Sequence, residues 1–270
     1  MPLLDNLLDR FGRWLARHLR REAPGEEPFV PSDADALRRT LRPGDVLLIA
    51  GSSKLSTAIK YLTQSTWSHA MLYVGDAVPA PNGGEPHSLI EVTPVDGCVA
   101  VPLSKYDHFH TRICRPVGLT NADREDVVRF MVSRIGLQYD MRNIFDLARY
   151  LLPTPPVPTR WRRRMIALGS GQPTRTICST LIAEAFGRVG YPILPRVEAI
   201  DDRTPGISHF RRQEILHIRH YSLYTPADFD LSPYFEIIKP TLEQGFNYKG
   251  LTWAREPSQR ASDKKSKRQS

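Results

Sequence analysis

The chain has 270 residues, 41% hydrophobic and 24% charged, a length and composition that suit one large globular domain with additional segments. Lysine and arginine number 37 against 29 acidic residues, so the net charge of +8 favours anionic surfaces as neighbours without separating membranes from nucleic acids. The three cysteines include no C-x-x-C pair, which argues against a disulfide scaffold and favours free thiols in a reducing compartment.

The first segment, residues 3–21, is predicted to form a basic amphipathic helix. Its leucines, Phe11 and Trp14 recur at helical spacing, with five arginines between them. Acidic residues interrupt the apolar run, so the segment has no signal-peptide core and is too short and too charged to span a bilayer. We favour docking of this helix on the protein's own body or on a second subunit, with an anionic membrane surface as the alternative. We therefore expect a cytoplasmic protein, with peripheral attachment to the inner face of the membrane as an option.

Five strands and one helix are predicted next. The helix covers residues 56–64, and its flanking strands are apolar or rich in β-formers. The predicted strands cover residues 46–49, 67–75, 88–92, 98–101 and 111–116. In outline they form an antiparallel meander, because short turns and loops separate most of them.

Helices are expected after residue 120. Residues 121–135 predict one with Asn121 as its N-cap, and residues 144–152 form another apolar stretch. The arginines at 160–164 suit a solvated loop, or contacts with phosphates. The polar and charged residues 251–270 predict a disordered basic tail.

A cysteine begins the helix predicted over residues 176–188. Leu181, Ile182 and Ala185 give that helix an apolar face, and Cys178 falls in its first turn. Unpaired N–H groups and the positive end of the helix dipole favour a thiolate there, so Cys178 is a candidate nucleophile. The alternative is that Cys178 only packs, as buried free cysteines usually do.

A thiol nucleophile needs a base, and the base needs an orienting partner. If the strands that carry His69 and Glu91 pair as a hairpin, the two residues lie opposite each other on one face, with Cβ atoms about 5 Å apart. Taken singly, His69 suits a core histidine and Glu91 an outward-facing strand residue. Their joint placement favours a carboxylate–imidazole pair.

Zinc binding is an alternative chemistry for the strand region. Cysteine and histidine side chains gather between residues 98 and 114, namely Cys98, His108, His110 and Cys114. Their spacing matches no familiar zinc pattern, so we expect neither a metal nor another cofactor.

Four short motifs in order resemble those of the circularly permuted papain-like cysteine amidases, which are related to NlpC-type hydrolases and lecithin retinol acyltransferases. They are Trp-Ser-His69-Ala, Ile-Glu91-Val-Thr-Pro with Gly97 after it, Gly-x-x-Tyr139-Asp140 and Ile-Cys178-Ser-x-Leu. The likeness covers about residues 41–240, including Thr225–Phe229 near its end. The amphipathic start, the insertion at 153–164 and the basic tail depart from the family pattern.

The resemblance implies an α+β fold of permuted papain-like type, with an antiparallel sheet or small barrel packed against helices that include the nucleophile helix. Residues 1–31 would then be helix and linker, residues 32–250 the catalytic domain and residues 251–270 the tail. It further implies Cys178 as nucleophile, His69 as base and Glu91 as the third member of a triad.

Four further residues are candidates for the cleft: Trp67, Ser68, Tyr139 and Asp140. Asp140 also competes with Glu91 as the orienting acid, although a structural turn is the favoured interpretation of Tyr139 and Asp140.

The expected activity is cysteine hydrolysis of an amide or ester through an acyl-enzyme. The substrate is either a peptide amide or an acyl lipid, and the second choice implies a membrane-surface acyltransferase or a phospholipase-like enzyme. A non-catalytic binding module and a membrane-surface scaffold are the alternatives from other classes. No nucleic-acid-binding motif occurs, so we expect no specific nucleic-acid partner.

Overall fold

The structure is a computed structural model that describes residues 33–93, 96–138, 177–199, 214–217, 221, 224–245 and 247–250. The predicted N-terminal helix, the stretches at 144–152 and 160–164, and the basic tail lie outside the described residues. Tyr139 and Asp140 lie outside them as well.

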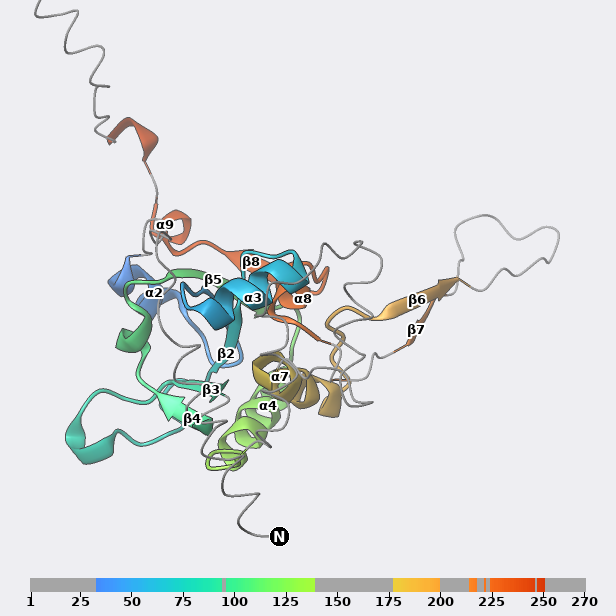
Figure 1. The fold of residues 1–270 in the computed structure, drawn as a ribbon, viewed down its shortest axis with the longest axis horizontal. Coiled ribbons are helices and arrows are strands. Elements are labelled where there is room, and N and C mark those ends of the chain that lie inside the picture. Colours follow the sequence, from blue (N-terminus) through green and yellow to red (C-terminus); the bar gives the residue numbers. More distant parts are fainter. Residues whose placement is uncertain are drawn as a thin grey trace, which may run out of the picture.

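An open antiparallel sheet of six strands forms the centre of the described part of the chain (Figure 1). Its order is β4-β3-β2-β1-β5-β8, so its ends do not close into a barrel. The strands are β1 (Val46–Ala50), β2 (His69–Tyr73), β3 (Leu89–Thr93), β4 (Gly97–Val101), β5 (His110–Pro116) and β8 (Phe235–Ile238). This confirms the expected α+β class with an antiparallel sheet.

The predicted meander holds for four strands and fails at the fifth. Strands β1 to β4 pair in sequence order, but β5 returns across the sheet and pairs with β1 instead of β4. A bidentate ion pair joins the starting end of β1 to the far end of β5, because Arg115 Nε and Nη2 donate to the Asp45 carboxylate at 2.9 and 2.7 Å. A buried carboxylate needs such a partner, which Asp45 finds 70 residues away.

Alternating side chains give the sheet two apolar faces. Val46 and Leu48 point to the face covered by α4 (Asn121–Ser133), α7 (Ile177–Arg188) and α8 (Pro226–Asp230). Figure 1 shows α4 and α7 side by side next to β2 and β3. Leu47 and Ile49 point to the opposite face, where α2 (Ala34–Thr40) and the 3₁₀ turn η2 (Leu103–Tyr106) pack. The core therefore consists of one apolar layer on each face of the sheet.

The helix predicted over 121–135 is α4, and its N-cap is Thr120, not Asn121 as predicted. Thr120 has an extended backbone, and its hydroxyl accepts a hydrogen bond from the Asp123 N–H at 3.1 Å. Asn and Thr are both good N-caps, so the local sequence does not distinguish neighbouring candidates. Val127 and Met131 are the fully buried residues of the helix.

Gly97 is required where β4 begins. Its φ is +71°, and an added Cβ would lie 2.2 Å from the Leu137 carbonyl oxygen. The segment after α4 runs along β4 there, with Cys98 N–H donating to that same oxygen at 2.9 Å. Only glycine combines this backbone angle with such close approach.

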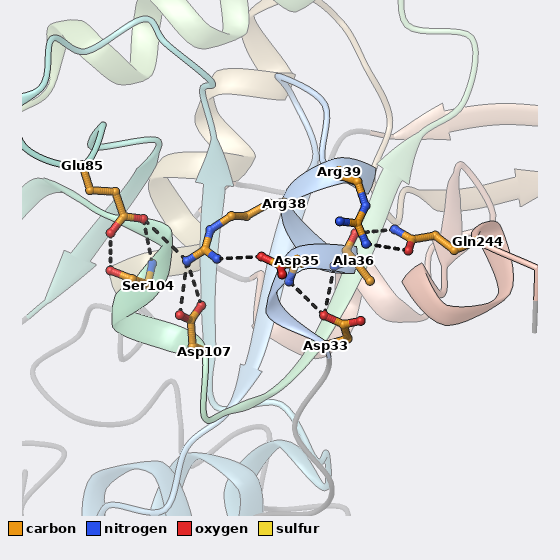
Figure 2. A network of polar contacts seen from close by, with 9 residues as sticks. All are labelled: Asp33, Asp35, Ala36, Arg38, Arg39, Glu85, Ser104, Asp107 and Gln244. Carbon is orange, nitrogen blue, oxygen red and sulfur yellow. Dashed lines mark hydrogen bonds and ion pairs between the residues drawn. The ribbon is translucent and has the colours of Figure 1, made fainter. Parts of the chain in front are cut away.

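A polar network ties α2 to the turn η2 on the second face (Figure 2). Arg38 contacts Asp35 and bonds Asp107 at 3.2 Å, while Ser104 donates to Glu85. On its other side α2 meets Gln244, which accepts from Arg39 at 2.8 Å. Exposed pairs of this kind contribute about 0–1 kcal/mol each. Their effect is to fix where η2 lies.

The remaining elements are α3 (Lys54–Thr63), η1 (Pro81–Gly83), α9 (Pro240–Glu243), η4 (Tyr248–Gly250) and a two-stranded pair of β6 (Arg196–Ala199) with β7 (Glu214–His217). Among the described residues, none of the helices has both the length and the apolar character needed to cross a membrane.

Candidate active site

Cys178 is the second residue of α7, in the first turn as predicted. Leu181, Ile182 and Ala185 bury the face of α7 that meets the sheet. The hydroxyl of Ser179 donates to the Tyr224 carbonyl at 2.7 Å, which fixes the first turn against the segment leading to α8. The thiol is therefore held at the helix start, with 5% of Cys178 exposed.

His69 is the first residue of β2, and buried backbone contacts hold it in place. The Ser68 hydroxyl accepts from the Gly51 N–H at 2.9 Å and donates to the Ile49 carbonyl at 3.3 Å. A Cβ on Gly51 would lie 2.4 Å from the Ser56 hydroxyl and 3.0 Å from the Ser68 hydroxyl, so a larger residue would displace these side chains. Ser68, a candidate cleft residue, is buried and bonded to backbone in this structure.

Glu91 meets His69 by a hydrogen bond of 2.8 Å between Glu91 Oε2 and His69 Nε2. The Glu91 side chain is 1% exposed and that of His69 22%. The predicted register is wrong in detail: Leu72 pairs with Ile90, which sets Glu91 level with Met71. His69 and Glu91 are thus diagonal on one face, and their long side chains span the extra distance.

Two further residues, Lys105 and Tyr106, complete the surroundings of Glu91. Lys105 Nζ donates to Glu91 Oε1, and the Tyr106 hydroxyl donates to Oε2. Burial favours a neutral carboxyl, but hydrogen bonds from His69, Lys105 and Tyr106 hold the pKa of Glu91 at about 2. Sequence reasoning missed both residues, since no local pattern predicts that η2 folds back onto β3.

The Cys178 thiol and the His69 imidazole form an interacting pair. Burial acts to raise the pKa of Cys178, but the charge and hydrogen bond of His69 and backbone hydrogen bonds at Ala70 and Ser179 lower it overall. Burial acts to lower the pKa of His69, but the Cys178 thiolate and then the Glu91 carboxylate raise it to about 10. These opposite shifts favour a thiolate–imidazolium pair.

Trp67, another candidate cleft residue, is 3% exposed and serves as a packing centre. Its ring stacks on His110 with centroids 5.4 Å apart, and the Arg112 guanidinium lies 4.9 Å from the ring centroid. Its Nε1–H donates to Asp230 at 2.9 Å. The structure thus places Trp67 and Ser68 next to His69 but with buried side chains.

The zinc alternative finds no support in the described part of the chain. No group of three or more His, Cys, Asp or Glu side chains there is arranged to hold a metal ion. Cys98 and Cys114 are instead buried in the apolar core beneath α4 and α7.

No protein-family model matches the chain, and no curated protein matches it. Among solved structures, the crystal structure of the metalloprotein yiiX from Escherichia coli O157:H7 is similar. It has 13% sequence identity and a TM-score of 0.42, and the match covers 73% of this chain and 96% of that one.

Proposed function

We propose that this protein is a cysteine hydrolase that cleaves an amide, or an ester, through a thioacyl-enzyme formed on Cys178. The observation that carries the proposal is the continuous Cys178–His69–Glu91 arrangement, in which the pKa of the thiol is lowered and that of the imidazole is raised. We also propose a circularly permuted papain-like fold, supported by the chain order of histidine and carboxylate strands before the nucleophile helix.

The proposed reaction begins with attack of the Cys178 thiolate on the carbonyl carbon. Because His69 Nε2 is bonded to Glu91, Nδ1 is the ring nitrogen left to exchange a proton with the reacting groups. The imidazolium gives that proton to the leaving amine or alcohol as the C–N or C–O bond breaks. A water molecule then attacks the thioester, His69 takes its proton, and the acid leaves while the Cys178 thiolate is restored.

Glu91 holds the imidazole orientation and stabilises its charge in this scheme. Lys105 and Tyr106 keep Glu91 ionised and fixed, so they are positioning residues. The Cys178 N–H, at the start of α7, is the first donor we propose for the developing oxyanion.

Amide and ester cleavage use the same thiol chemistry. Both a peptide amide and an acyl lipid are therefore candidate substrates for the proposed triad. A membrane-surface acyltransferase would use residues 1–21 as its anchor, and these lie outside the described residues. The lowered pKa of Cys178 favours an enzyme over a non-catalytic binding module, which needs no activated thiol.

The test is the pH dependence of alkylation by iodoacetamide, read for each cysteine by peptide mass spectrometry. We expect Cys178 to react with an apparent pKa well below the ordinary value of about 8.5. Cys98 and Cys114 are internal controls that should stay unmodified in the folded protein, since both are fully buried. A Cys178 titration at the ordinary value would contradict the proposal.

A further inference from the structure

A pocket of about 350 Å³ lies at the end of the sheet where β5 begins and β8 ends. Its walls include apolar side chains from β8 and α9, among them Ile237, Pro240 and Leu242. Its polar walls include Arg112 and Lys239, and none of the described residues that line it is acidic. The pocket is therefore apolar with a positive edge.

The Arg112 guanidinium is held rigidly at this edge. Its Nη1 donates to Asp230 Oδ1 at 2.6 Å, and its central carbon lies over the Trp67 ring, 4.9 Å from the centroid. A guanidinium fixed in this way loses little conformational entropy when it binds an anion. Lys239, which also lines the pocket, is exposed. Because Asp230 offsets Arg112, the positive charge among the residues that line the pocket comes mainly from Lys239.

The sheet register places this pocket close to the catalytic histidine. His69 pairs with Ile49, and Ile49 pairs in turn with Thr111 of the pocket wall. Two interstrand spacings, about 9–10 Å, separate the two backbones. An extended peptide advances about 3.3–3.6 Å per residue, so two or three residues span that gap.

We propose that this pocket binds the free carboxylate and the apolar last residue of a short peptide. Its volume is near the lower limit of about 300 Å³ for ligand sites, which suits one or two residues better than a long acyl chain. The positive edge complements a carboxylate, and the walls from Ile237 to Leu242 complement an apolar side chain. That the bound peptide is also the amide cleaved at Cys178 rests on the proposed function.

Binding is tested directly with a Cys178→Ala variant, which cannot turn the peptide over. The probe is N-acetyl-alanyl-leucine with a free carboxylate, compared by calorimetry with the same peptide ending in a carboxamide. We expect the carboxylate form to bind about tenfold more tightly, because a charge-assisted hydrogen bond replaces a neutral one. Equal affinities, or no binding of either peptide at millimolar concentration, would overturn the proposal.

Matched surface variants locate the site. In the same background, Lys239→Gln should weaken binding about three- to tenfold, while Lys249→Gln, an exposed lysine away from the pocket, should not. Leu242→Ser should also weaken binding, because Leu242 lines the pocket. Leu231→Ser should not, and it is a matched control because the two leucines are similarly exposed, at 55% and 66%. The same loss in both members of a pair would refute a pocket at this place.

The two proposals fail separately. If Cys178 is alkylated with an ordinary apparent pKa while the protein still prefers the carboxylate peptide, the hydrolase proposal is rejected and the pocket proposal stands. A low pKa for Cys178 without any preference for the carboxylate would do the reverse.

Discussion

The pKa of a cysteine thiol is shifted in opposite directions in two regions of the protein. It is lowered beside His69 at the start of β2 and raised in the centre of the core. Cys178, Cys98 and Cys114 are all buried, with 5%, 0% and 0% of each residue exposed. Burial raises the pKa of Cys98 to about 11 and raises that of Cys114 further, because neither thiol has a cationic partner strong enough to offset it. Cys178 has His69 beside it, and its pKa is lowered.

The difference shows that a buried thiol is activated by its partners and not by burial itself. Desolvation penalises the thiolate in both regions. Only at the start of β2 do the His69 imidazolium and backbone hydrogen bonds at Ala70 and Ser179 compensate for this penalty. The reactivity of the Cys178 thiol should therefore fall when His69, Glu91 or a residue that holds Glu91 is replaced.

Replacing His69 with Ala should remove the contrast between the cysteines. The thiolate loses its cation and the proposed reaction loses its proposed base, so turnover should fall by about 10²–10⁴-fold. Alkylation of Cys178 at pH 6.5 should slow markedly as its pKa rises toward the ordinary value. His108→Ala is the matched control, because His108 is exposed and lies outside the site. Full activity in His69→Ala would eliminate His69 as the base.

Replacing Glu91 with Gln should lower turnover by about 10²-fold, since the imidazole loses its orienting charge. It should also change stability with pH. The folded-state pKa of Glu91 is about 2, below its ordinary value of 4.5, so ionised Glu91 stabilises the fold above that ordinary value. The stability gap between wild type and variant, from urea unfolding, should shrink as pH falls from 4.5 toward 2. A gap that stays constant would mean that Glu91 is not held ionised by its partners.

Lys105→Met and Tyr106→Phe should have smaller effects, about three- to tenfold on turnover, because each removes one of several bonds to Glu91. Each should raise the pKa of the Glu91 carboxyl, measured from its carbon chemical shift. Lys249→Met is the control for loss of an exposed lysine charge. An unchanged Glu91 titration in both variants would show that η2 packs near the carboxylate without positioning it.

Cys98→Ala and Cys114→Ala should have the smallest effect on chemistry. Both thiols are buried in the apolar core, so turnover and Cys178 labelling should match wild type. Each substitution leaves a small gap in the core and should lower the free energy of unfolding by about 1 kcal/mol. Circular dichroism melting curves measure that cost, and a loss of labelling in either variant would reopen the assignment of the nucleophile.

Much of the local structure was predictable from the sequence, because it depends on neighbouring residues. Apolar runs and stretches rich in β-formers, bounded by turn residues, predicted the strands from Val46 to Pro116, and period 3.6 predicted α4 and α7. The alternation of side chains along a strand put His69 on the face of its strand shared with Met71 and Glu91 on the face of its strand shared with Leu89, and the start of α7 put Cys178 in a first turn. Each of these conclusions needed no contact between distant segments.

The tertiary structure alone decided which segments meet. The return of β5 to β1, the diagonal register of His69 and Glu91, and the approach of η2 to β3 all depend on packing across the sheet. Trp67 bonds to Asp230 across 163 residues, and Arg112 reaches the same carboxylate across 118. Periodicity determines which way a side chain points, but only the packed core determines what it points at, because long-range pairing depends on the burial of the whole sheet.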